Sequence, residues 1–495
     1  MKIISNKIDL RTQNIDTLIY FIFEEKNLLD NNLKLLDASM NQKISDLVKE
    51  KLITGKEQEI NLIHNTLNTK AKKIILVGLG KKHKFNLDII RSASGDLSRF
   101  LKNKNIQEAH ILLELPLKTK SANIFEATVE GLILGNYEFQ NFKNIKTKNT
   151  LPIIKKISIS SELSNQAQNK IIKKSQIITN AVNIARDLAN TPSNFLTPET
   201  FVEKAKALLE QKEKITIEVI DKEKAASLGL LAFLGVAKGS SNPPYLLIIN
   251  YKGGIISEPS SALIGKGITF DSGGISIKPS NKMAEMKGDM TGAANVLATI
   301  YALASLKADK NILALIPLAE NMPSGSAQKP GDIVTAMNGK TIEIINTDAE
   351  GRLILADAIC FAVKNKVKEI IDIATLTGAC SVALGDVASA ILGNNQVMIN
   401  KMIEISKKTG ERLWQLPLYE EFLDYLKSDV ADIKNCTENR LAGTASAAKF
   451  LEQFVDRKPW IHLDIASTNY AEATKGYQVK GMTASGTRNL IEYFL

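Results

Sequence analysis

The 495-residue chain has little cysteine and no long apolar run, and each shortage excludes a class of protein. Its three cysteines (Cys360, Cys380 and Cys436) are an odd number, lie far apart and form no CxxC pair. A disulfide framework is therefore excluded, and we expect buried thiols in a reducing cytoplasm. The chain has no run of about eighteen apolar residues, as a membrane-spanning helix would need. Its start lacks the apolar core and cleavage site of a secretory signal, so we expect a cytoplasmic protein.

Histidine is scarce as well, with four residues in the chain. His64, His83 and His110 stand at no spacing that would make them partners, and we assign them no role. His462 could ligate a metal by its chemistry, but its nearest carboxylate, Asp464, belongs to an apolar run typical of a strand. A histidine-rich metal site is therefore not expected.

The overall composition is that of a globular protein with an excess of positive charge. Hydrophobic residues make up 44% and charged residues 23%, which are ordinary values. The 63 basic and 53 acidic residues give a net charge of +10, as in proteins that bind nucleic acid or a membrane surface. The lysines are spread along the chain, which favours a global compositional bias. DNA binding stays open as an alternative, because sequence alone does not place the charges on one surface.

At this length two domains are expected, and the first 160 residues alternate between strand and helix patterns. Apolar runs predict strands at 17–23, 73–80 and 109–114, and helical periodicity predicts helices at 87–101 and 122–136. Gly95 weakens the first of these helix predictions. The turn at Gly78 and Gly80 lacks the third glycine of a phosphate-binding loop, so a plain turn is favoured. The order predicts an α/β domain over residues 1–160 with a mostly parallel sheet.

A helical pattern at 165–190 predicts a linker helix within residues 161–192, between the two domains. Pro192 ends this pattern, and Thr197 before Pro198 is a typical start of the next helix. Helices and buried strands then alternate to the end of the chain. We expect a larger α/β catalytic domain over residues 193–495, with a mixed central sheet flanked by helices.

The most informative stretch is Asn346–Leu353, with the sequence NTDAEGRL. A short strand is predicted before it and an apolar, alanine-rich helix after it, so Asp348 and Glu350 lie on a strand-to-helix turn. In extended chain these two carboxylates leave the same face, where they repel each other unless a cation lies between them. Gly351 is expected to permit a backbone geometry closed to other residues. A metal site is one interpretation, and a solvated acidic turn that caps the helix is the other.

A second cluster about eighty residues upstream favours the metal site. A predicted strand at 262–265 leads into GKGITFDSGG, and KGDM follows it. The two clusters together supply Asp271, Asp289, Asp348 and Glu350, with Lys266, Lys278 and Arg352. Such carboxylate-rich, histidine-poor sets suit Mn, Mg or Zn, and four carboxylates match two adjacent cations. A metal-dependent phosphoesterase would use the same groups and is kept as an alternative.

These three motifs, at these separations, resemble the leucyl aminopeptidase (cytosol aminopeptidase) family of two-metal exopeptidases. The resemblance covers roughly residues 170–490 and is only general over the first 160. It implies that five residues bind two divalent ions, Mn or Zn, and that Asp271 and Glu350 bridge both. Lys266 and Asp289 would complete the tighter site, and Asp348 the more exchangeable one. It also implies catalytic roles for Lys278 and Arg352, and a structural one for His462.

The family's chemistry gives each of these residues a physical role. Lys266 ligates only as the neutral amine, which an adjacent dication favours by lowering its pKa. Two cations generate hydroxide from a bridging water near neutral pH, and one of them can hold the free α-amine of a peptide. Lys278 would stabilise the tetrahedral oxyanion. The resemblance further implies that Arg352 holds a bicarbonate acting as general base.

The same resemblance implies a substrate pocket, an assembly and a cellular role. The pocket residues would be Met286, Leu376, Gly378 and Ala466. None of them is charged, so we expect removal of N-terminal leucine or methionine. Ser467 stands where relatives usually have glycine, and Asn469 where an apolar pocket residue is common, which puts the fine preference in question. A homohexamer and a role in intracellular peptide turnover are implied, and some bacterial relatives also bind DNA.

Overall fold

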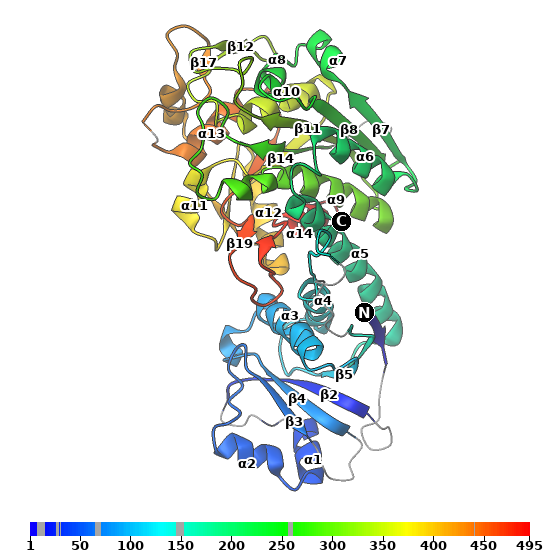
Figure 1. The fold of residues 1–495 in the computed structure, drawn as a ribbon. Helices are drawn as coiled ribbons and strands as arrows, with labels where there is room; N and C mark the ends of the chain where they lie inside the picture. The colour runs from blue at the N-terminus through cyan, green and yellow to red at the C-terminus, as the bar shows by residue number, and fades with distance from the viewer. Residues whose placement is uncertain are drawn as a thin grey trace. The chain divides into compact units, whose positions relative to one another are not determined.

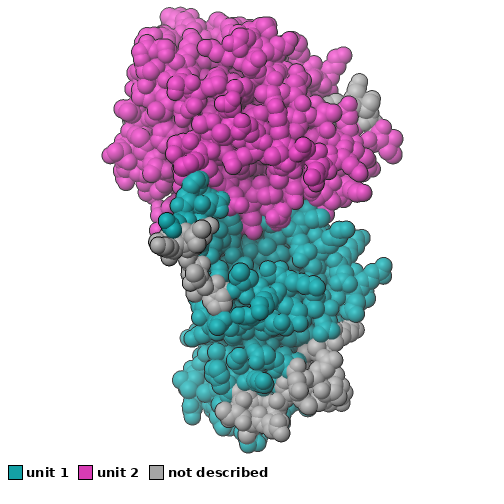
Figure 2. Space-filling model, turned by 45° about the vertical axis from the view of Figure 1, so that its right-hand side comes forward, with its two compact units in different colours: residues 1–179, 473–479 teal, residues 180–472, 480–495 magenta. Residues whose placement is uncertain are grey.

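The computed structural model describes residues 1–6, 15–25, 29, 31–64, 71–144, 153–255, 261–439 and 441–495. They form two compact units, shown in different colours in Figure 2. Unit 1 comprises residues 1–179 and 473–479, and unit 2 comprises residues 180–472 and 480–495. Helix α5, Asn165–Asn190, has the bounds of the expected linker helix and runs from one unit into the other. The domain boundaries expected at residues 160 and 192 stay predictions.

Within its described residues, unit 1 contains one six-stranded sheet with helices on both faces. The strand order is β1 (Lys2–Ser5), β6 (Lys156–Ser161), β5 (Glu108–Leu113), β2 (Ile15–Ile22), β4 (Ala71–Gly78) and β3 (Ile60–His64). All neighbours pair in parallel except β3 and β4. The helices are α1 (Asn31–Ser39), α2 (Lys43–Lys49), α3 (Leu87–Asn103) and α4 (Ser121–Leu134). The expected mostly parallel sheet is confirmed.

The apolar strands of unit 1 are buried from both sides. Along β2, Leu18 and Tyr20 pack in a cluster with residues of α1 and α2. Ile19 and Phe21, on the opposite face, pack in a cluster with residues of α3 and α4. Figure 1 shows these two helix pairs on opposite sides of the sheet. Because both faces are covered, the strands are almost continuously apolar rather than alternating.

Helix α3 continues through Gly95, where a glycine is needed for close packing against a neighbouring segment. A Cβ on Gly95 would lie 2.5 Å from the carbonyl oxygen of Gly476. A Cβ on Gly135, which directly follows α4, would lie 2.4 Å from the Cα of Gly95. Tertiary packing therefore overrides the weak helical propensity of glycine, and the predicted helix is confirmed.

Unit 2 is built around a mixed sheet, as expected. The strand order is β16 (Leu413–Gln415), β15 (Ser389–Gly393), β18 (Trp460–Asp464), β14 (Glu369–Ala374), β9 (Ser261–Gly265), β11 (Asn311–Asn321), β8 (Tyr245–Lys252) and β7 (Ile215–Ile220), with β10 (Gly267–Asp271) beside β11. The central strands from β18 to β11 are parallel. The outer strands β15, β8 and β7 pair antiparallel to their inner neighbours.

Unit 2 also contains further helices, a three-stranded sheet and a two-stranded sheet. The helices are α6 (Pro198–Leu209), α7 (Lys222–Ser227), α8 (Leu231–Ala237), α9 (Thr291–Leu306), α10 (Gly351–Lys364), α11 (Gly378–Leu384), α12 (Gln396–Thr409), α13 (Gly443–Glu452) and α14 (Thr487–Phe494). The three-stranded sheet consists of β12 (Ile333–Thr335), β13 (Thr341–Glu343) and β17 (Ile433–Lys434), and the two-stranded sheet consists of β19 (Tyr470–Ala471) and β20 (Gly481–Met482). Helices α9 and α10 both contact the central strand β9. In the part of the chain that the structure describes, no helix is long and apolar enough to cross a membrane.

The parallel strands bring several chain segments to one edge of the sheet. Lys266 directly follows β9, Thr375 follows β14, and Asp271 and Asp464 end β10 and β18. The carboxyl ends of parallel strands are where α/β proteins commonly bind ligands. Polar and charged side chains from distant parts of the sequence therefore gather at this edge.

Candidate active site

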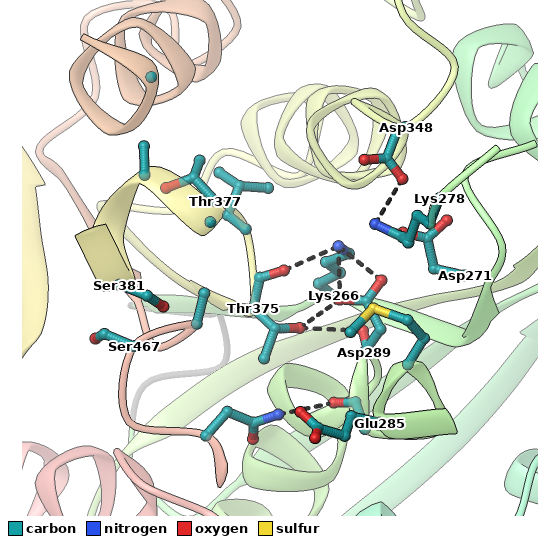
Figure 3. A pocket seen from close by; sticks show the side chains of 18 of the residues that line it. Lys266, Asp271, Lys278, Glu285, Asp289, Asp348, Thr375, Thr377, Ser381 and Ser467 are labelled. Carbon is teal, nitrogen blue, oxygen red and sulfur yellow. Dashed lines mark hydrogen bonds and ion pairs between the residues drawn. The ribbon is translucent and has the colours of Figure 1, made fainter. Parts of the chain in front are cut away.

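Every residue that the sequence predicts for the site lines one cavity of unit 2, with a volume of about 790 Å³. Figure 3 shows the charged side chains pointing toward one another from different segments. The lining includes Lys266, Asp271, Lys278, Met286, Asp289, Asp348, Glu350, Arg352, Leu376, Gly378 and Ala466. The structure thus brings the predicted residues together, and their roles stay predictions.

Lys266 lies at the inner side of the charged cluster and is 3% exposed. Its Nζ is 2.9 Å from Asp289 Oδ1 and 2.8 Å from Glu350 Oε1. It also donates a hydrogen bond of 2.9 Å to the carbonyl oxygen of Thr375, whose hydroxyl donates to Asp289 Oδ1 at 2.7 Å. These contacts fix the lysine between two carboxylates and a backbone carbonyl.

Lys278 lies nearer the opening and contacts the other two carboxylates. Its Nζ is 2.8 Å from Asp271 Oδ2 and 2.5 Å from Asp348 Oδ1. Asp271, Asp348 and Glu350 each offer an oxygen, and these atoms lie within 4.8 Å of one another. Asp348 and Glu350 lie on a turn rather than in extended chain, and they still direct their carboxylates to one point.

The electrostatics of the cluster are dominated by crowded carboxylates. Burial raises the pKa of Asp348 to about 7, with a further contribution from Asp271 and Glu350. Burial also raises the pKa of Asp289 well above its ordinary value. Burial lowers the pKa of Lys266, but Asp289 and Glu350 raise it more, so the balance lies above the ordinary value. The carboxylates alone therefore hold Lys266 as an ammonium, and only dications would release its proton.

Two buried polar atoms of the cluster lack partners in the described chain, which fits a metal and an anion. Glu350 is 2% exposed, and its Oε1 forms an ion pair with Lys266, whereas its Oε2 has no hydrogen-bond partner among the described residues. Arg352 donates through Nη1 to the carbonyl oxygen of Asn435 at 2.9 Å, whereas its buried Nε has no hydrogen-bond partner in the described chain. Buried polar groups are normally satisfied. The donor set is therefore suited to divalent cations beside the carboxylates and to an anion beside Arg352.

The reason that the sequence suggests for a glycine at position 351 is wrong. The sequence predicts an unusual backbone geometry at Gly351, but this residue is the first of α10 and has no positive φ. A Cβ at this position would lie 2.6 Å from Cε and 2.7 Å from Nζ of Lys266. Glycine is needed here because it leaves room for the buried lysine.

Comparison with known proteins identifies the family. A model of the catalytic domain of the cytosol aminopeptidase family matches residues 183–491, and a model of that family's N-terminal domain matches residues 19–146. The chain belongs to the cytosol aminopeptidase family. The resemblance seen in the motifs is confirmed, and it extends into the N-terminal part. The protein is a metallo-aminopeptidase, a hydrolase.

Relatives of this aminopeptidase match over nearly their whole length. A probable cytosol aminopeptidase of Alkaliphilus oremlandii is 40% identical over 494 residues, 99% of this chain and 98% of the relative. One of Geotalea uraniireducens is 40% identical over 459 residues, 92% of each chain. A mutant of tomato leucine aminopeptidase has a TM-score of 0.89 and 30% identity, and the match covers 100% of this chain and 96% of that one. The bottromycin maturation enzyme BotP in complex with Mn has a TM-score of 0.85 and 28% identity, with coverage of 97% and 99%.

The aminopeptidase site also depends on residues that the sequence interpretation missed. Asn321, the last residue of β11, donates to Asp271 Oδ1 at 2.8 Å and to the carbonyl oxygen of Thr347 at 3.1 Å. Thr375 links Lys266 to Asp289 through its carbonyl and its hydroxyl. The sequence does carry one sign of their role, because both are polar residues at the carboxyl ends of buried strands.

Asp464 organises the walls of the cavity without facing the carboxylate cluster. Its side chain is fully buried at the end of β18. Oδ1 accepts hydrogen bonds from the backbone N–H groups of Leu376 and Ala466, both at 3.1 Å, and Oδ2 accepts one from the Thr377 hydroxyl at 2.6 Å. One carboxylate thus holds two segments that carry predicted pocket residues.

We expect Asp464→Ala to lower kcat/KM by about 10²-fold, the effect of misplacing binding groups by roughly 1 Å. The loss should include a rise in KM, because the displaced groups line the cavity. Asp464→Asn keeps an acceptor for the backbone N–H groups and should restore most of the activity. Steady-state kinetics of both variants on an N-terminal leucine substrate make the comparison. Equal losses in the two variants would contradict this positioning role.

His462 lies away from the cavity lining, in the core of unit 2. Its Nδ1 is 2.5 Å from Asp372 Oδ1, and Asp372 Oδ2 accepts a hydrogen bond of 2.6 Å from Trp460 Nε1. Burial lowers the pKa of His462, but Asp372 raises it more, so the balance lies above the ordinary value. This contact pairs the histidine with a buried carboxylate, in keeping with the structural role that the family implies.

Proposed function

We propose that the protein is a two-metal aminopeptidase that releases N-terminal apolar residues, preferably leucine or methionine, from peptides. The observation that carries this proposal is the convergence of Asp271, Asp348 and Glu350, whose oxygens lie within 4.8 Å of one another. Lys266 contacts both Glu350 and Asp289, and these contacts extend the donor set. Five donor residues in one cluster support two neighbouring cations rather than one.

The five residues would divide between the two ions as the family resemblance implies. Asp271 and Glu350 would bridge both ions, Lys266 and Asp289 would complete the tighter site, and Asp348 the exchangeable one. Bound Mn or Zn would lower the pKa of a shared water and hold the substrate α-amine.

Two basic residues would assist the reaction, one at the substrate carbonyl and one at the group that accepts a proton. The side chain of Lys278 is 22% exposed in the cavity, so its ammonium can reach a substrate carbonyl oxygen and stabilise the developing oxyanion. Arg352 would hold bicarbonate, which would accept a proton beside the carboxylates. The buried, unpaired Nε of Arg352 in the described chain supports this assignment.

The apolar preference rests on the cavity wall formed by Met286, Leu376, Gly378 and Ala466. None of these four carries a charge, so a charged N-terminal side chain would lose its hydration without gaining a partner. A strong preference for charged N-terminal residues would contradict this part of the proposal.

The cellular setting is proposed from the family. We place the enzyme in the cytoplasm, as a homohexamer that takes part in peptide turnover. DNA binding stays a secondary proposal that rests on the net charge of +10. The phosphoesterase alternative has no support among the relatives.

The proposal predicts metal-dependent cleavage that requires a free α-amine. Metal-stripped protein should not hydrolyse leucine p-nitroanilide, and added Mn or Zn should restore the activity. N-acetylleucine p-nitroanilide should remain uncleaved with either ion, because its amine is blocked. Release of p-nitroaniline measures both reactions. Full turnover by the metal-stripped protein would refute the proposal, and so would equal cleavage of the acetylated substrate.

A further inference from the structure

An unpaired amide oxygen lies in the wall of the substrate cavity. Asn469 lines the cavity and is 8% exposed. Its Nδ2 donates to the carbonyl oxygen of Gly288 at 3.3 Å and lies 3.4 Å from Met482 Sδ. In the described chain, its buried Oδ1 has no hydrogen-bond partner. A buried acceptor without a partner is costly, so this atom requires an explanation.

The orientation of the amide is set by its surroundings. If the amide were flipped, Asn469 Oδ1 would face the carbonyl oxygen of Gly288, and two acceptors would meet. The group that remains unpaired is therefore the oxygen, an acceptor. Met482, which also lines the cavity, lies beside the amide nitrogen. A methionine changes rotamer readily, so this side chain can give way to a substrate side chain that approaches the amide.

The neighbouring polar residue does not offer the same chemistry. Ser467 donates its hydroxyl to the carbonyl oxygen of Ala388 at 2.7 Å and lies 3.4 Å from Cys380 Sγ. Its oxygen is thus already engaged within the protein. Of these two polar residues, Asn469 is the one with an unused acceptor in the described chain.

We infer that Asn469 Oδ1 accepts a hydrogen bond from a donor in the N-terminal side chain of the substrate. The substrate class therefore includes peptides that begin with asparagine or glutamine, beside those that begin with leucine or methionine. Their amide N–H groups satisfy the buried oxygen, which offsets the loss of their hydration. This inference rests on the proposed aminopeptidase function and extends its pocket.

Asparagine and leucine have side chains of similar size and branching, so a comparison of the two tests hydrogen bonding with little change in size. The wild-type, metal-loaded enzyme is given Asn-Ala-Ala and Leu-Ala-Ala, and kcat/KM is measured for each. A fully apolar pocket would disfavour asparagine by roughly 100-fold. We expect the two values to lie within tenfold of each other, and a larger deficit for asparagine would overturn the inference.

The variant Asn469→Leu replaces the amide with an apolar group of similar size and branching. The ratio of kcat/KM for Asn-Ala-Ala to that for Leu-Ala-Ala should fall about tenfold, while the leucine peptide is still cleaved. Ser467→Ala should leave this ratio unchanged, because its hydroxyl bonds to the backbone. Circular dichroism checks that both variants fold.

Each other outcome is decisive as well. An unchanged ratio in Asn469→Leu overturns the inference while the proposed function stands. Loss of both activities in a folded Asn469→Leu variant also overturns it, because the amide would then serve the reaction itself. If the variant does not fold, the wild-type comparison decides. If the wild type cleaves neither peptide, the proposed function fails and this inference fails with it.

Discussion

Glu350→Gln should abolish aminopeptidase activity and weaken metal binding while the protein remains folded. The change keeps the shape of the side chain and removes one negative charge. The side chain of Glu350 is buried, its Oε1 forms an ion pair with Lys266, and its Oε2 has no hydrogen-bond partner within the described chain. A glutamine offers one neutral oxygen where two cations need a bridging carboxylate. We expect kcat/KM to fall by about 10³-fold or more, at least as much as the loss of one oxyanion-stabilising donor.

The measurement combines kinetics with metal content. Protein loaded with Mn or Zn is desalted, its bound metal is determined by mass spectrometry, and hydrolysis of leucine p-nitroanilide is followed. Glu218→Gln, on the exposed side of β7 in the same unit, is the matched control and should behave as wild type. If Glu350→Gln retained full activity and its metal, Glu350 would not be a bridging ligand.

The amino-acid sequence is sufficient to predict which charged residues gather at this site, because most of them lie in short motifs. Asp348, Glu350 and Arg352 lie within five positions of one another, and Lys266 and Asp271 within six. The first set lies on one turn and the start of α10, and the second lies at the two ends of the short strand β10. Local spacing therefore predicts that the members of each set share a site. The family resemblance then joins the two sets.

The supporting residues could not be predicted because they depend on strand order. Asp464 reaches Leu376 only because β18 pairs with β14 in parallel, with Asp464 opposite Ala374. Asn321 reaches Asp271 because β11 pairs with β10 in the register that sets them side by side. Sequence periodicity identifies such strands, but it does not say which strands are neighbours. For the same reason Gly95 looked like a weak point of a helix, when it is a point of close packing.

Gly351→Ala should cause a large loss of activity with little loss of stability. The added methyl group would lie 2.6 Å from Cε of Lys266, a distance at which one of the two groups must move. Lys266 has little freedom to move, because its Nζ contacts Asp289, Glu350 and the Thr375 carbonyl within 2.9 Å. The displacement would therefore pass to the carboxylates, and we expect kcat/KM to fall by about 10²-fold.

The effect on stability separates this prediction from ordinary damage to the fold. Gly351 begins α10 with an ordinary backbone conformation, where alanine favours the helix by up to about 1 kcal/mol. This gain partly offsets the cost of overpacking, about 1–3 kcal/mol. The free energy of unfolding, measured with denaturant, should therefore change by less than about 2 kcal/mol, the remainder of these two terms. Gly325→Ala is the control, since a Cβ there meets no atom within 4 Å of the described chain. Wild-type activity in Gly351→Ala would show that Lys266 can shift without harm, and that its position does not matter for the reaction.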